Sequence, residues 1–133
     1  MFKNVQRIFT DKVNETVNKI TYFKDKFPYE KRLEEATRII EKYPNRVPII
    51  VERGNHNVKQ IDRKKYLVPR DLSMGQFMHI IRERIKLPSH ESIYLFIGGS
   101  LPPTSALIEQ IYEKHKDTDN FLYVTYCAES TFG

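Results

Sequence analysis

The sequence predicts a single α+β domain built on a mixed β-sheet. Short apolar runs, which are typical of strands, alternate with longer stretches in which apolar residues recur every three or four positions, as in helices. Prolines and glycines separate these elements. With 133 residues, of which 40% are hydrophobic, the chain is long enough to form a core without disulfides or metal ions.

Helices are predicted ahead of the first strand. Residues 1–20 place apolar side chains at helical spacing, and we expect an N-terminal helical extension here, in front of a domain at residues 21–133. A second helix is expected at about residues 30–42, because Pro28 suits its start and Pro44 stops it.

Strands and further helices follow in a fixed order. The predicted strands cover residues 47–51, 65–68, 93–97 and 121–126. A helix between the second and third strands begins with a capping box, Ser73 to Gln76, and a shorter helix is expected at about residues 105–115. Each helical stretch is long enough for a crossover between parallel neighbours. This order describes a ubiquitin-like β-grasp with additional N-terminal helices.

Composition and charge limit the classes of function. The net charge of +5 favours acidic partners such as anionic lipid, nucleic acid or acidic peptides. Cys127 is the only cysteine, which excludes an internal disulfide and fits a reducing compartment such as the cytosol. Lys3 and Arg7 interrupt any signal-peptide core, and no apolar run approaches the roughly 20 residues that span a bilayer. We therefore expect a cytoplasmic protein that does not enter a membrane by itself.

The sequence gives less support to an enzyme or to a nucleic-acid-binding protein. The 4 histidines are scattered, and none stands at a motif spacing from Cys127. Acidic residues mostly pair with basic ones at helical spacing, as Glu34 does with Arg38, so no catalytic carboxylate pair, metal or cofactor is expected. Basic residues and 8 tyrosines could stack on bases, but the RNA-recognition consensus is absent. We expect no enzymatic activity and no nucleic-acid partner.

The last residue, Gly133, follows closely on a strand-like run. Because glycine has no Cβ, its carboxylate can enter a narrow enzyme channel and be activated there without a steric penalty. A small domain that presents such a carboxylate is typical of a modifier that is attached to another molecule. Processing also produces chains that end on glycine, so the tail alone does not decide the function.

A series of motifs resembles one known family. The motifs lie at residues 27–32 (FPYEKR), 42–48 (KYPNRVP), 64–69 (KKYLVP), 102–105 (PPTS), 121–126 (FLYVTY) and 132–133 (FG). Over about residues 22–133 the chain resembles the autophagy ubiquitin-like modifiers, the family of GABA type A receptor-associated protein and microtubule-associated protein light chain three. Residues 1–20 depart from the pattern, because the family usually starts later.

The resemblance implies a modifier rather than an enzyme. It implies ATP-dependent activation of Gly133 by an E1-like activating enzyme, transfer through a conjugating enzyme and amide linkage to phosphatidylethanolamine on autophagosomal membranes. A processing cysteine protease of the family exposes the glycine and later releases the lipid. The alternative is a ubiquitin-like adaptor in trafficking that binds the same peptides without being lipidated.

The resemblance also implies a peptide-binding groove beside the strand at residues 65–68. An edge strand can pair with an extended peptide. In the family this peptide carries a Trp/Phe/Tyr-x-x-Leu/Ile/Val motif with acidic neighbours, found in cargo receptors and adaptors. By position, a first hydrophobic pocket is expected to involve Glu35, Ile39, Pro48, Ile50, Lys65, Leu67 and Phe121. A second is expected to involve Tyr66, Val68, Pro69, Leu72, Phe77 and Ile80, with Arg84 near an acidic flank.

A simpler interpretation of the same residues stays open at this stage. Lysines on an exposed edge strand also protect a protein from edge-to-edge aggregation. The apolar residues could then belong to the core alone.

Overall fold

A computed structural model describes residues 21–55 and 58–128. The expected helix at residues 1–20 and the expected conjugation site at Gly133 lie outside the described residues. The described elements are α2 (Phe23–Lys26), α3 (Tyr29–Lys42), β1 (Arg46–Arg53), β2 (Lys65–Pro69), α4 (Met74–Ile85), β3 (Ile93–Phe96), α5 (Ile108–His115) and β4 (Leu122–Ala128).

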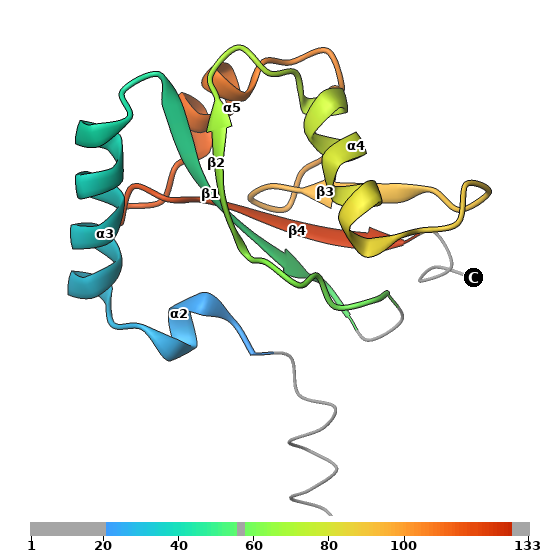
Figure 1. Ribbon diagram of the computed structural model, residues 1–133, viewed down its shortest axis with the longest axis horizontal. Helices are drawn as coiled ribbons and strands as arrows, with labels where there is room; N and C mark the ends of the chain where they lie inside the picture. Colours follow the sequence, from blue (N-terminus) through green and yellow to red (C-terminus); the bar gives the residue numbers. More distant parts are fainter. Residues whose placement is uncertain (1–20, 56–57, 129–133) are drawn as a thin grey trace, which may run out of the picture.

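The strands form one mixed sheet in the order β2-β1-β4-β3. β1 and β4 run parallel, whereas β2 and β3 are antiparallel to their neighbours, so the predicted α+β class with a mixed sheet is confirmed. Among the described strands, β2 has a neighbour on one side only. This places β2 at an edge of the sheet (Figure 1).

The two faces of the sheet carry separate cores because side chains alternate along each strand. Ile49 and Val51 of β1 belong to the main core, which contains residues of α4 and α5. Ile50, between them, belongs to a smaller core with Phe23 of α2 and Ala36 of α3. Helices α2 and α3 therefore lie on one face, and α4 and α5 lie on the other (Figure 1).

Local sequence signals placed α4 correctly. The Ser73 hydroxyl accepts a hydrogen bond from the Gln76 backbone N–H at 3.1 Å, and the Gln76 side chain accepts one from the Ser73 N–H at 2.8 Å. This is the predicted capping box, and it fixes the first turn of the helix. The helix ends at Lys86, whose φ of 55° lies in the left-handed region.

Two elements differ from the sequence prediction. Helix α5 begins at Ile108, later than the expected start near Ser105, because Ala106 closes a turn on the Pro103 carbonyl instead. Helix α2 was not predicted, since its four residues are too few to show a helical period. Within the described residues, no helix combines the length and the apolar character that crossing a bilayer requires.

Candidate peptide-binding groove

The expected first pocket draws its residues from four parts of the chain. Glu35 and Ile39 lie on α3, Pro48 and Ile50 on β1, Lys65 and Leu67 on β2, and Phe121 directly ahead of β4. The sheet register pairs Pro48 with Leu67 and Ile50 with Lys65, so these four residues are neighbours. Lys65 reaches Glu35 as well, with 2.6 Å between Nζ and Oε2. The sheet register and this ion pair thus bring α3, β1 and the edge strand β2 together.

Three of these residues lie beneath the surface, and Pro48 is one of them. Ile50 is 0% exposed and Phe121 is 1% exposed, and both belong to the small core under α2 and α3. They form a floor that supports the region, whereas Lys65 is exposed above it. The geometry therefore separates supporting residues from residues that a ligand can touch.

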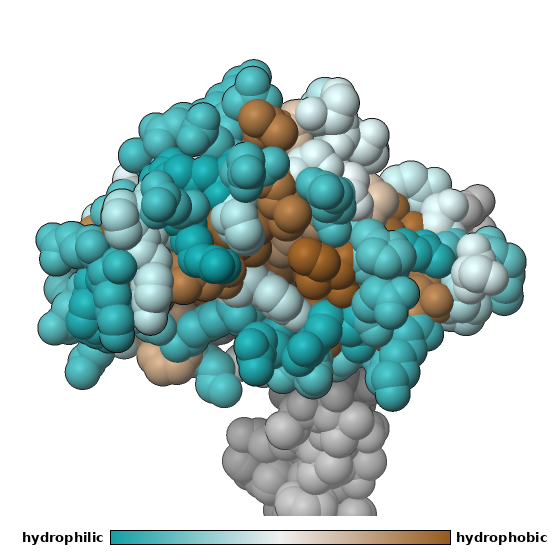
Figure 2. Space-filling view, turned by 45° about the horizontal axis from the view of Figure 1, so that its top comes forward, coloured by the Kyte–Doolittle hydropathy of each residue, from teal (hydrophilic) through white to brown (hydrophobic). Residues whose placement is uncertain are grey.

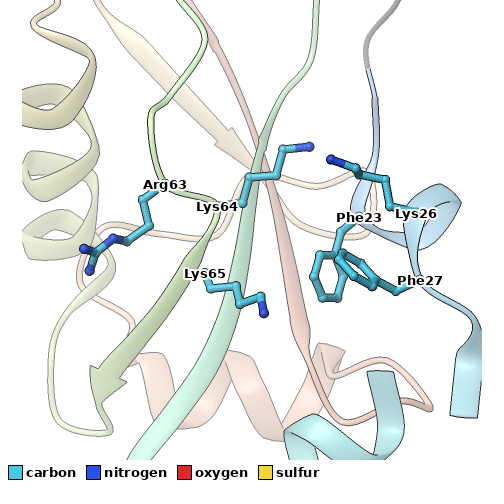
Figure 3. Close-up of a pocket in the computed structure, with 6 residues that line it drawn as sticks. All are labelled: Phe23, Lys26, Phe27, Arg63, Lys64 and Lys65. Carbon is cyan, nitrogen blue, oxygen red and sulfur yellow. The ribbon is translucent and has the colours of Figure 1, made fainter. Parts of the chain in front are cut away.

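A pocket of about 480 Å³ opens between α2 and the start of β2. Its lining consists of Phe23, Lys26, Phe27, Arg63, Lys64 and Lys65. Figure 3 shows the two phenylalanine rings side by side, with the Lys65 amine directed toward them and the Arg63 side chain directed away. The Lys65 Nζ lies 5.5 Å from the Phe23 ring centroid and 5.9 Å from that of Phe27, within range of cation–π attraction. The pocket therefore combines an aromatic wall with several positive charges.

Sequence reasoning missed most of this pocket. Lys65 was the one lining residue expected in a pocket, and Arg63 and Lys64 were expected only as part of the edge-strand segment. The resemblance pointed to α3, β1 and β2 and left the α2 residues out. One signal was available: Phe23 and Phe27 stand four residues apart, directly ahead of Pro28. Such a pair can bring both rings together across one helical turn. In the structure Phe27 is the C-cap residue of α2, and the two ring centroids lie 4.9 Å apart.

Polar contacts, some of them buried, hold α2 and α3 against β1 and the loop ahead of β4. The Phe23 backbone N–H donates to the Glu52 carboxylate, and Lys24 pairs with Asp117 at 2.7 Å. Arg32 lies 3.1 Å from Asp119, whose side chain is fully buried. These contacts fix the position of the aromatic wall relative to β2.

Tyr123 and Asp117, which belong to this network of polar contacts, have shifted pKa values. Burial, followed by the hydrogen bond that its hydroxyl donates to Asp119, raises the pKa of Tyr123. Burial alone would also raise the pKa of Asp117, but the hydrogen bond and charge of Lys24, with a bond from the Asp119 backbone, lower it overall. Asp117 is therefore stabilised as a carboxylate and Tyr123 as a neutral phenol.

The residues expected in the second pocket come from β2, from α4 and from the turn that joins them. Val68 is 4% exposed and Phe77 is 0% exposed, so both belong to the main core. The Tyr66 ring meets the Phe77 ring edge to face, with centroids 6.0 Å apart. Ile80 is 37% exposed, and Leu72 and Pro69 are half-buried. Figure 2 shows hydrophobic surface exposed between hydrophilic patches on one face of the molecule.

Arg84 lies on the last turn of α4 and pairs with Asp62. The Arg84 Nη2 lies 3.0 Å from the Asp62 Oδ2, and both side chains are partly exposed. Burial raises the pKa of the neighbouring Tyr66; the charge of Arg84 opposes this shift and that of Asp62 adds to it. Arg84, which was expected near an acidic flank of the ligand, is therefore already in contact with an acid of its own chain.

Metal binding was weighed above for the histidines, and nucleophilic catalysis for Cys127. Among the described residues, no group of three or more His, Cys, Asp and Glu side chains is arranged to hold a metal ion. Burial raises the pKa of the Cys127 thiol, which disfavours the nucleophilic thiolate. A Cβ on Gly54 would lie only 2.4 Å from the Cys127 sulfur, so this cysteine packs tightly against a neighbouring backbone.

The fold defines a ubiquitin-like protein, a mixed β-sheet with helix α4 packed in its main core. Solved structures agree: Trypanosoma brucei ATG8 has a TM-score of 0.80 at 38% identity, with 86% of this chain and 100% of that chain covered. The Plasmodium falciparum Atg8 in a complex with a Plasmodium falciparum Atg3 peptide has a TM-score of 0.76 at 36% identity, covering 81% of this chain and 96% of that chain.

Sequence comparison identifies the family. The model of autophagy protein Atg8, ubiquitin-like, matches residues 31–133. Autophagy-related protein 8 of Kluyveromyces lactis is 54% identical over 84% of this chain and 90% of its own length. Autophagy-related protein 8d of Arabidopsis thaliana is 55% identical over 86% of this chain and 96% of its own length. The chain belongs to the Atg8 family of ubiquitin-like autophagy proteins, and the resemblance found in the sequence is confirmed.

Proposed function

We propose that this protein is a modifier of autophagy that is conjugated through Gly133 to phosphatidylethanolamine and recruits motif-bearing cargo receptors and adaptors. The observation that carries the proposal is the edge of β2, which pairs with no further strand among the described residues. It is flanked by an aromatic and basic pocket on one side and by exposed or partly exposed apolar residues, such as Ile80 and Leu72, on the other. Conjugation holds the domain on autophagosomal membranes from the cytoplasmic side. In this role the protein is a substrate of activating, conjugating and processing enzymes and not itself an enzyme.

The physical argument for a covalent lipid starts from charge. Each Lys or Arg near an anionic surface contributes only about 1 kcal/mol, and salt screens it. Acyl chains contribute about 0.8 kcal/mol for each buried CH₂, so two chains hold a protein far more strongly. The net charge of +5 can orient the domain on a membrane, and the lipid holds it there.

The argument for peptide binding rests on the groove beside β2. An extended peptide would continue the sheet at the β2 edge, with its acidic neighbours beside Lys26, Lys64 and Lys65. An aromatic anchor would enter on the α2 side and an aliphatic anchor on the α4 side. Two anchors at about 1.5–3 kcal/mol each and a few strand hydrogen bonds at about 1 kcal/mol each correspond to micromolar binding, about −8 kcal/mol.

Reconstitution tests the conjugation. The chain is incubated with family activating and conjugating enzymes, ATP and liposomes that contain phosphatidylethanolamine, and the lipid adduct is detected by mass spectrometry. We expect the adduct on the wild type and none on Gly133→Ala, because the added methyl group obstructs a narrow channel. A wild type that stays unmodified would reject conjugation and leave the non-lipidated adaptor as the function.

A peptide titration tests the groove. We expect an acidic Trp-x-x-Leu peptide to bind the wild type and to bind Lys65→Ala and Leu67→Ala more weakly. Lys116→Ala is the matched control, because Lys116 is exposed after α5, outside the proposed groove. Unchanged affinity in both groove variants would reject this assignment. In a separate salt-titrated binding assay, tight and steeply salt-dependent RNA binding would instead favour a nucleic-acid partner.

A further inference from the structure

Arg84 is held by an acid of its own chain. Its Nε donates to the Asp62 Oδ1 at 3.2 Å, and its Nη2 lies 3.0 Å from both carboxylate oxygens. Asp62 belongs to the segment that leads into β2. The pair therefore joins the last turn of α4 to the start of the edge strand.

This pair lies at the end of the surface proposed for the aliphatic anchor. Arg84 follows Ile80 by four residues on α4, so the two side chains share one helical face. Ile80 is 37% exposed. The charges of Arg84 and Asp62 both contribute to the pKa shift of Tyr66 on β2. A peptide on β2 that covers Ile80 would bring its own side chains close to Arg84.

The contact between Arg84 and Asp62 determines how Asp62 affects the binding of such a peptide. A guanidinium presents its N–H groups in planar forks that each match one carboxylate, and Asp62 occupies the fork formed by Nε and Nη2 of Arg84. The Arg84 and Asp62 side chains are 37% and 68% exposed, respectively. Exposed pairs of this kind change an equilibrium by only about 1.4- to 5-fold, so a ligand carboxylate can exchange with Asp62.

We propose that Asp62 is a built-in competitor that sets how strongly the groove favours acidic peptides. Without a peptide, its carboxylate occupies the Nε and Nη2 of Arg84. On binding, a glutamate or aspartate of the peptide replaces it there, while the charge of Asp62 still opposes that acid. Asp62 is therefore a specificity-determining residue, and this inference rests on the proposed peptide-binding function.

The test uses the full chain and a set of fluorescent peptides. The parent peptide carries a Trp-x-x-Leu motif and neutral flanks, and each variant has one glutamate at a successive flanking position. Dissociation constants are measured by fluorescence anisotropy for the wild type, Asp62→Asn and the matched control Asp71→Asn. Asp71 is exposed and follows the other end of β2, so its variant removes the same charge elsewhere. Circular dichroism verifies that the variants are folded.

We expect Asp62→Asn to bind the peptides that carry glutamate near Arg84 about two- to fivefold more tightly than the wild type does. The parent peptide should bind both equally, and Asp71→Asn should behave as the wild type. In an Arg84→Gln background the gain from Asp62→Asn should vanish, because the two residues then no longer compete through one guanidinium.

Several outcomes would overturn the inference. It fails if Asp62→Asn changes the affinity of all peptides by one common factor, if Asp71→Asn gives the same gain, or if the gain persists with Arg84→Gln. In each of those cases the peptides still bind, and the proposed function stands. If no peptide binds any variant, the peptide-binding function fails and this inference fails with it.

Discussion

The two sides of β2 are held in place by different forces. On the α2 side, charged and polar contacts fasten the helices, such as the buried Arg32–Asp119 pair and the ion pair of Lys24 with Asp117. On the α4 side, Phe77 and Tyr66 pack ring against ring at the main core. Charged contacts respond to pH and salt, whereas apolar packing does not titrate. The α2 side should therefore be the adjustable half of the groove. The core packing on the α4 side should be the constant half, and only the exposed Arg84–Asp62 pair at its end should respond to salt.

The largest expected effect is a loss of stability when the core packing on the α4 side, the constant half, is disrupted. Phe77→Ala should lower the free energy of unfolding by about 3–5 kcal/mol, because it leaves a cavity where a fully buried ring now packs. Urea denaturation measures this loss, which should be the same at pH 5 and pH 8. Ile80→Ala on the same helix serves as the control and should cost much less, since Ile80 is 37% exposed. A loss below about 1 kcal/mol for Phe77→Ala would contradict the description of this side as core.

A second prediction concerns the segment that leads into β2. The Tyr126 hydroxyl donates to the Lys59 carbonyl at 2.7 Å and accepts from the Ile61 N–H at 2.8 Å. Tyr126→Phe leaves both backbone groups without this partner, so it should cost about 1–3 kcal/mol at pH 8. Burial raises the pKa of Tyr126 to about 12, from 10.0.

The raised pKa of Tyr126 determines how this difference in stability changes with pH. The folded state favours the neutral phenol, so the contribution of the hydroxyl is complete below pH 10.0 and is lost as the pH rises toward about 12. The stability difference between the wild type and Tyr126→Phe should therefore shrink between pH 8 and pH 11. A difference that grows with pH would show that the hydroxyl is not held in its neutral form.

A third prediction tests the adjustable half through binding. Lys65→Ala should weaken binding of an acidic Trp-x-x-Leu peptide by about fivefold, roughly 1 kcal/mol, because it removes an exposed charge near the ligand's acids. It should also flatten the dependence of the dissociation constant on NaCl. Ile80→Ala is the comparison on the other side: it should weaken binding and leave the salt dependence unchanged. Equal salt dependence in the wild type and Lys65→Ala would erase the contrast between the two sides.

The smallest expected effect concerns Lys24 and Asp117. The pKa of Asp117 is lowered from 3.8 in the folded protein, so the stabilisation that it contributes is present above that pH and is lost as the pH falls below it. Lys24→Met should therefore lower the unfolding free energy at pH 7 by less than about 1 kcal/mol, since Lys24 is partly exposed. The difference should disappear near pH 2, as thermal unfolding at both pH values can verify. A difference that is larger at pH 2 would contradict the lowered pKa.

Local signals explain why some of these features were predictable from the sequence. Helix α4 could be placed from its capping box and apolar spacing, because both signals lie within the helix itself. Helix α2 could not, because its position depends on Glu52 and Phe121, which are distant in the sequence. The pairing of Arg84 with Asp62 joins residues 22 positions apart and exists only once β2 and α4 are assembled. The resemblance supplied expected pocket residues, and the structure separates the exposed ones from those that only support them.

The edge of β2, which pairs with no further strand in the part of the chain that the structure describes, also affects how densely this protein can cover a surface. Unpaired strand edges join readily when two molecules are held close together. Here the strand starts at Lys65, and Lys64 stands directly before it. Like charges that meet across paired strands repel each other. The lysines proposed to attract acidic peptides would thus keep crowded copies of the domain apart, so that each copy remains free to take its own partner.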